Sequence, residues 1–138
     1  MSRPAGRRRR GRELALRVLF ELEGTAKDPR ATLAYQATEM GVPGDAAAFA
    51  GRLVEGTLEH VDRIDATIGE ASDNWDLVDF GKVERAVLRL GTFEVLFEPG
   101  TPVAVSIDES LELTRVYAGD EAVPLVNGVL GRIARERV

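Results

Sequence analysis

The sequence predicts an all-α protein, and three observations support this fold class. Apolar residues recur at spacings of three and four, which is the period of a helix with one buried face. No turn dipeptide lies between alternating apolar runs, as a β-hairpin would require. Glycine and proline stand at the ends of the periodic segments, where helices usually stop. We therefore expect about seven helices in a single domain of 138 residues, which is long enough to bury a core without disulfides.

The first half of the chain contains two periodic segments before residue 41. Leucine and valine recur every four residues from 14 to 22, so this helix buries one stripe, and Gly24 follows its end. A shorter helix is expected after Asp28 and Pro29, and it should end at Gly41, which precedes a Val-Pro pair. Both boundaries are predicted from capping residues as well as from periodicity.

The third periodic segment is the longest in the chain. Its apolar stripe runs from Phe49 to Ile68, with Asp45 as the expected N-cap, and we expect a kink or a break near Gly56. Residues 69–76 resemble a joint, since they are polar and rich in turn formers. The predicted organisation is therefore an N-terminal helical subdomain of about 13–70 and a C-terminal one of about 75–138.

Three further helices are expected after the joint. The segment from 83 to 97 is apolar over a wide arc, which predicts a central helix that contacts neighbours on two sides. The next helix begins either at Thr101, with Pro102 in its first turn, or at Ser106, which starts a capping-box pattern. The sequence leaves these two starts open. Pro124 then opens a last helix.

The charge distribution points to a phosphate-rich partner. The first twelve residues contain no acid and six arginines, which are Arg3, Arg7, Arg8, Arg9, Arg10 and Arg12. The rest of the chain has 12 basic against 23 acidic side chains, so residues 1–12 form a basic arm on an acidic body. Arginine binds phosphate oxygens through two donors, remains charged, and stacks on unpaired bases. The alternative is a solubilising tail or an expression remnant.

No enzyme chemistry is expected from this sequence. Cysteine is absent, and His60 is the only histidine, which we expect on a helix surface. No nucleophile motif, phosphate-binding glycine loop or metal-ligand spacing accompanies it, so we expect no catalytic residue, no metal and no cofactor. No apolar stretch of membrane-spanning length and no export signal is evident, so we expect a cytoplasmic protein.

Two other features have both a structural and a functional interpretation. Asn127 and Gly128 lie within a helical stripe, where both residues are unfavourable. Close packing at the glycine is the favoured explanation, and contact of the Asn127 amide with a nucleotide is the other. Trp75 and Phe80 flank the joint, where aromatic side chains usually anchor a core.

Four blocks of the chain together resemble one known family. They are RRRGRELA at residues 8–15, VERAVLRL at 83–90, PVAVSIDESLEL at 102–113 and VNGVL at 126–130. This pattern is similar to that of the NusB family of bacterial antitermination factors, and it extends over essentially the whole chain. The resemblance implies an all-α, NusB-like fold, with an N-terminal helical group packed on a C-terminal one.

The resemblance also implies partners and binding residues. NusB proteins pair with NusE, a small-subunit ribosomal protein, and the pair binds the single-stranded boxA element of ribosomal RNA transcripts. The pair helps to assemble an RNA polymerase antitermination complex. By similarity, the expected RNA-binding residues are Arg8, Arg9, Arg10, Arg12, Phe20, Arg115, Tyr117 and Asn127. The expected NusE-binding residues are Lys82 and Glu84.

The chain departs from the family pattern at three positions. Leu125 stands where many members have an aromatic residue, Ala122 where they have serine, and Asp108 where they have asparagine. None of these changes threatens the fold, but each is expected to affect RNA affinity or base preference.

Two other functions compete with RNA binding through NusE. One is a purely protein-binding helical module, for example a homodimer, in which the arginines serve only solubility. The other is a separately encoded guide domain like those fused to ribosomal RNA cytosine methyltransferases, although the chain ends at Val138 with no room for a methyltransferase fold. Loss of RNA binding on changing Arg8, Arg9 and Arg10 to alanine would argue against the protein-binding module.

Overall fold

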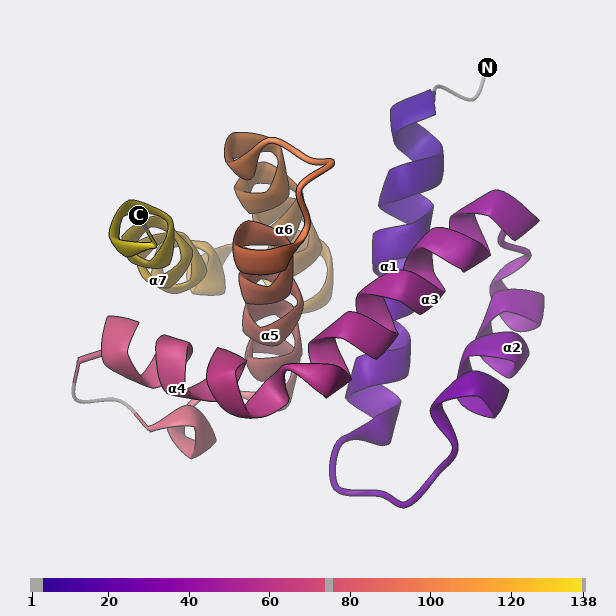
Figure 1. Cartoon of the computed structure of the whole chain (residues 1–138), viewed down its shortest axis with the longest axis horizontal. Helices are drawn as coiled ribbons and strands as arrows, with labels where there is room; N and C mark the ends of the chain where they lie inside the picture. The colour runs from indigo at the N-terminus through magenta and orange to yellow at the C-terminus, as the bar shows by residue number, and fades with distance from the viewer. Residues whose placement is uncertain (1–3, 74–75, 138) are drawn as a thin grey trace. The chain divides into compact units, whose positions relative to one another are not determined.

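The computed structural model describes residues 4–73 and 76–137, with side chains from residue 6 onward, and confirms the all-α prediction (Figure 1). Arg3 and Trp75 lie outside the described residues. Within the described ranges there is no β-strand, and none of the helices is long and apolar enough to cross a bilayer. The α-helices are α1 (Pro4–Leu22), α2 (Pro29–Met40), α3 (Gly44–Glu59), α4 (Val61–Ala71), α5 (Lys82–Phe97), α6 (Val103–Tyr117) and α7 (Val123–Glu136). Two short 3₁₀ helices, η1 (Leu77–Asp79) and η2 (Asp120–Ala122), precede α5 and α7.

The chain divides into two compact units, one ending at Leu58 and the other beginning at Glu59. The sequence placed this division at residues 69–76 instead. The difference arises because α4 packs with the later helices, where it contacts α5 and α7. The segment that looked like a joint therefore falls within the second unit, and its first residues belong to α4.

The first unit contains α1, α2 and nearly all of α3. Leu14 and Val18 of α1 are fully buried, as the four-residue spacing predicts, and α1 packs along α2. The α2 boundaries also agree with the prediction. The Asp28 carboxylate caps the helix by accepting a hydrogen bond from the Ala31 amide at 2.9 Å, and Gly41 ends it in a left-handed conformation.

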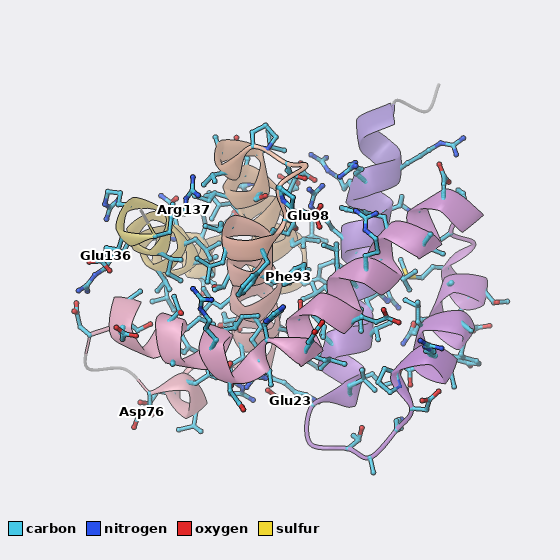
Figure 2. All side chains as sticks on the ribbon, in the orientation of Figure 1. Glu23, Asp76, Phe93, Glu98, Glu136 and Arg137 are labelled. Atoms are coloured by element: carbon cyan, nitrogen blue, oxygen red, sulfur yellow. The ribbon has the colours of Figure 1, made fainter. Side chains whose placement is uncertain are left out.

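The long third stripe is broken at His60 and not at Gly56, where the sequence placed the break. Gly56 lies inside α3, while His60 has non-helical dihedral angles at the start of α4. The His60 ring stacks on Phe97 of α5, with centroids 4.1 Å apart. The ring of Phe93, labelled in Figure 2, has its centroid 6.3 Å from that of His60 and 5.8 Å from that of Phe97. His60 is thus half-buried against aromatic side chains at the position where the stripe breaks.

The second unit is arranged around α5, as its wide apolar arc predicts. This helix contacts α4, α6 and α7. Gly91, near its middle, makes the closest approach: a Cβ atom there would lie 2.7 Å from Ser110 Oγ of α6 and 3.0 Å from Leu130 Cδ1 of α7. Phe80, before α5, is buried, as expected of a core anchor.

The start of α6 is close to the first of the two predicted starts. The helix begins at Val103, with Pro102 as its N-cap. Ser106 does not cap the helix, since it is buried inside it, with its hydroxyl 3.3 Å from the Glu94 carboxylate of α5. The last helix begins at Val123 with Pro124 in its first turn, as predicted.

Candidate nucleic-acid interface

The basic segment is helical over the described residues. Because α1 begins at Pro4, the arginines from Arg7 to Arg12 are spread around helical turns and do not form an arm that precedes a helix. Their spacing on the helix directs them to different neighbours within the first unit. The surroundings of each arginine decide whether it can meet a ligand.

Two of the arginines are engaged by groups of α2 and α3. The Arg7 guanidinium donates a hydrogen bond to the Asp45 carboxylate at 2.8 Å. This hydrogen bond lowers the pKa of Asp45, so the carboxylate stays charged and offsets the positive charge of Arg7. Arg10 donates to the Met40 carbonyl oxygen at 2.8 Å and pairs with Glu13 at 2.9 Å. Asp45, predicted as an N-cap, lies in the first turn of α3, where its carboxylate accepts from the Ala46 amide.

Gly11 sets the contact between α1 and α3. A Cβ atom at this glycine would lie 2.8 Å from Cδ2 of Phe49 and 2.9 Å from the Ala46 carbonyl oxygen, distances that real Cβ atoms do not adopt. The glycine therefore allows the Phe49 ring to lie directly against the α1 backbone. Neither Gly11 nor Phe49 was predicted to belong to the basic site.

Arg8 and Arg12, one turn apart, flank this ring. Their guanidinium carbons lie 4.5 Å and 5.3 Å from the Phe49 ring centroid, which is cation–π geometry. Arg8 is exposed, as is Arg9. Arg12 is only 2% exposed, so it contributes to packing in this conformation and does not present its guanidinium to solvent. Of the arginines from Arg7 to Arg12, the exposed residues are Arg7, Arg8 and Arg9, and Arg10 is half-buried.

A further arginine, Arg52 of α3, was not among the residues predicted from the sequence. Its guanidinium carbon lies 5.3 Å from the same Phe49 centroid, and the residue is exposed. The available signal was the three-residue spacing of Phe49 and Arg52, which places both on one side of a helix. We call Arg8, Arg12, Arg52 and Phe49 the Phe49 cluster.

The other predicted RNA-binding residues are divided between the two units. Phe20, at the opposite end of α1 from the Phe49 cluster, is 39% exposed. Arg115, Tyr117 and Asn127 belong to the second unit. Arg115 is exposed but pairs with Glu112 at 2.9 Å and with Asp120 at 3.5 Å, while Tyr117 is half-buried at the end of α6.

The Asn127-Gly128 pair lies inside α7, as expected, but close packing does not explain its glycine. Both residues are exposed, and a Cβ atom at Gly128 would meet no atom within 4 Å among the described residues. The favoured packing interpretation is therefore wrong. An exposed amide on a regular helix is available to a ligand, which leaves the nucleotide-contact interpretation of Asn127 as a proposal.

Lys82 and Glu84 lie in the first turn of α5. Lys82 is exposed, whereas Glu84 is half-buried and its carboxyl group folds back over Gly81. A Cβ atom at Gly81 would lie 2.6 Å from Oε1 of Glu84. A carboxylate at a helix N-terminus is stabilised by the helix dipole, so Glu84 has a local structural role whether or not a partner contacts it.

The positions that depart from the family pattern also lie in the second unit. Asp108 is exposed on α6, Ala122 is in η2, and Leu125 is half-buried in α7. Each of the three therefore reaches the surface at least in part.

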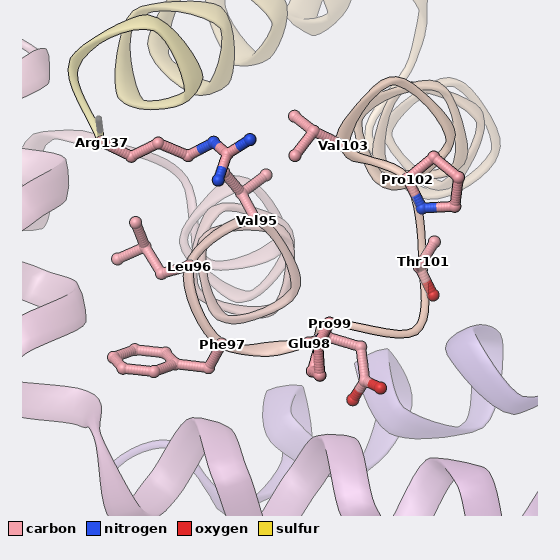
Figure 3. Close-up of a pocket in the computed structure, with 9 residues that line it drawn as sticks. All are labelled: Val95, Leu96, Phe97, Glu98, Pro99, Thr101, Pro102, Val103 and Arg137. Atoms are coloured by element: carbon pink, nitrogen blue, oxygen red, sulfur yellow. The ribbon is translucent and has the colours of Figure 1, made fainter.

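A hollow of about 440 Å³ lies at the turn between α5 and α6 (Figure 3). Its walls include Val95, Val103 and Pro102, and the Arg137 guanidinium lies close to Val95 and Val103. Its ionisable side chains are Glu98 and Arg137, and it contains no histidine. Over the residues that the structure describes, no group of three acidic or histidine side chains could hold a metal ion. The arginines of α1 and α3 are therefore the stronger candidate site.

Comparisons with known proteins agree on one family. The NusB family model matches residues 9–135. The transcription antitermination protein NusB of Heliobacterium modesticaldum is 40% identical over 94% of this chain, which spans 63% of that relative's length. The NusB protein of Desulforamulus reducens is 39% identical over 91% of this chain and 88% of its own length.

Solved structures show the same similarity. A structure of T. maritima NusB matches with a TM-score of 0.87 and 35% identity, covering 99% of this chain and 94% of that one. A crystal structure of antitermination factors NusB and NusE in complex with dsRNA matches with a TM-score of 0.86 and 28% identity, covering 94% of this chain and 96% of the matched one. From the family match, the sequence identities and the shared fold, we conclude that this chain belongs to the NusB family.

Proposed function

We propose that this protein is a non-catalytic, RNA-binding antitermination factor that acts in the cytoplasm, where it pairs with NusE and binds boxA in ribosomal RNA transcripts. The observation that carries the proposal is the exposed arginine surface of α1, where Arg8 and Arg9 face solvent and Arg8 is held on Phe49. An ordered guanidinium group loses less conformational freedom when it binds phosphate than one on a flexible arm.

The charge balance supports a role for a partner protein. The chain has a net charge of −5, so its acidic body repels RNA except near the basic helix. A few arginines alone give a weak and salt-sensitive association with a single strand. NusE would complete the RNA surface, and the solved complex of NusB and NusE with dsRNA supports such an arrangement.

The N-terminal turn of α5 is the proposed NusE-facing region. Lys82 is exposed there, and the Glu84 carboxyl group lies over Gly81 at the helix start. An exposed cation beside a held carboxylate offers one donor and one acceptor group to a partner protein. Arg115, Tyr117, Phe20 and Asn127 are proposed as further RNA contacts, and Arg12 as a residue that supports the Phe49 ring.

Fluorescence anisotropy with a labelled boxA RNA and a base-scrambled RNA, with and without NusE, tests this function. We expect preferential boxA binding whose affinity increases at least about tenfold when NusE is added. The partner adds contacts to the RNA and lowers the conformational entropy that the strand loses on binding. A log–log salt slope of roughly −3 to −4 is expected, which corresponds to four to six neutralised phosphates on a single strand.

Two results would contradict the proposal. Equal binding of both RNAs would leave only nonspecific attraction to a basic helix. No binding of either RNA, with or without NusE, would favour the protein-only module.

A further inference from the structure

We propose that Arg52 of α3 is an RNA-phosphate-binding residue, and that Phe49 positions it together with Arg8, so that the RNA surface of the first unit comprises two helices and not α1 alone. This inference rests on the proposed function. It adds a residue outside the arginine-rich segment and a structural element, the Phe49 ring, that organises the site.

The geometry of the Phe49 cluster is the first argument. The guanidinium carbons of Arg8 and Arg52 lie 4.5 Å and 5.3 Å from one ring centroid, although the residues belong to different helices. Both arginines are exposed, while Phe49 is only 5% exposed. Their charged groups therefore gather at the surface around one buried ring.

The fixed position of the ring is the second argument. Phe49 packs against the α1 backbone at Gly11, where even a methyl group would not fit. The ring therefore has little freedom to move away from α1. Cation–π contacts with an immobile ring restrict the arginine side chains, so the two guanidinium groups are partly ordered before a ligand arrives.

The charge around the cluster is the third argument. Three guanidinium groups, those of Arg8, Arg12 and Arg52, surround this ring and repel one another. A phosphodiester strand supplies successive anions, and each guanidinium group can donate two hydrogen bonds to one phosphate.

The test measures boxA RNA affinity of the full chain with NusE for Arg52→Gln and for a matched control, Arg30→Gln. Arg30 is an exposed arginine of α2 in the same unit, so both variants lose one charge from the same acidic protein. We expect Arg52→Gln to weaken binding about threefold to tenfold and to reduce the magnitude of the log–log salt slope by about 0.7, the value for one lost phosphate contact. Arg30→Gln should change the RNA affinity by less than about twofold and should leave the log–log salt slope unchanged.

The role of Phe49 is tested by a double-mutant cycle. Phe49→Leu keeps an apolar side chain but removes the π face, and circular dichroism establishes that the variant is folded at the assay temperature. We expect Phe49→Leu to weaken RNA binding and the Arg52→Gln effect to shrink in that background, because the two residues act through one contact. If Phe49 had only a structural role, the effects of Phe49→Leu and Arg52→Gln on RNA binding would be additive. That result would contradict its positioning role.

The outcomes separate this inference from the proposed function. An Arg52→Gln variant that binds like Arg30→Gln, while Arg8→Ala/Arg9→Ala loses binding, would overturn the inference and leave the function standing. If wild type does not bind RNA, or if Arg8→Ala/Arg9→Ala binds as well as wild type, the proposed RNA surface itself is wrong, and the role of Arg52 is rejected with it.

Discussion

The variant Arg8→Ala/Arg9→Ala is expected to bind boxA RNA at least about 100-fold more weakly than wild type, because each lost hydrogen bond from a charged group contributes roughly 1.5–3 kcal/mol. Both side chains are exposed on α1, so their removal should leave the fold intact. The log–log salt slope should fall in magnitude by about 1.4, the equivalent of two phosphates on a single strand. Fluorescence anisotropy across a salt series measures both quantities. Arg10 is left in place because it holds the Met40 carbonyl oxygen, and its loss would mix stability with binding.

The control for this variant is Lys27→Ala/Arg30→Ala. Lys27 pairs with Glu21 and Arg30 with Glu55, so this double variant removes the same charge from the first unit at a distance along the chain from the Phe49 cluster. It should bind RNA nearly as wild type does. Equal losses of RNA affinity in the two double variants would mean that the net charge, and not the position of the arginines, governs RNA binding.

Gly91→Ala is expected to lower the free energy of unfolding by up to about 2 kcal/mol, even though alanine is the better helix former. Its Cβ atom would lie 2.7 Å from Ser110 Oγ and 3.0 Å from Leu130 Cδ1, so these two buried side chains must shift or their helices must move. A shift of the Ser110 hydroxyl would disturb its hydrogen bond to the Ser106 carbonyl oxygen. Overpacking of about 1–3 kcal/mol exceeds the gain of roughly 1 kcal/mol in helix propensity. Urea unfolding followed by circular dichroism measures the change in midpoint at constant slope.

Gly128→Ala is the matched variant, with the opposite expected sign. Gly128 also lies inside a helix of the second unit, but nothing is within 4 Å of the added Cβ atom among the described residues. Alanine should therefore raise the free energy of unfolding by about 0.5–1 kcal/mol. Stabilisation by both alanines would show that the α5 contact at Gly91 is looser than described.

Much of the fold could be predicted from the sequence because helix boundaries depend on local chemistry. Asp28 and Gly41 delimit α2 through interactions within a few residues of themselves, and Pro124 lies in the first turn of α7 as expected. The central place of α5 also followed from its apolar arc, since a helix buried on two sides needs apolar residues on two sides.

The remaining features depend on contacts between segments distant in sequence. The His60 ring, at the break of the third stripe, stacks on an aromatic ring of α5. The division of the chain depends on which helices α4 packs against. Gly91 and Gly128 look alike as glycines within helical stripes, but one lies between helices and the other at the surface. Helical periodicity alone cannot distinguish the two.

The location of the candidate site stays a prediction, and its local contacts could not be predicted from the sequence. Arginine density drew attention to residues 7–12, but it could not assign Arg7 to Asp45, Arg10 to Met40, or Arg12 to a buried position. Those assignments depend on what α2 and α3 place beside each turn of α1. The RNA contacts themselves stay a prediction for all of these arginines.

Titration of the ¹⁵N-labelled protein with boxA RNA, followed through the arginine Nε–Hε signals by NMR in the presence of unlabelled NusE, tests the central claim most directly. We predict that the signals of Arg8, Arg9 and Arg52 shift or broaden as RNA is added, while that of Arg30 does not. A scrambled RNA should give smaller changes at the same concentration. If the Arg8, Arg9 and Arg52 signals remain unchanged while RNA is bound, the surface formed by α1 and α3 is not the RNA-binding site.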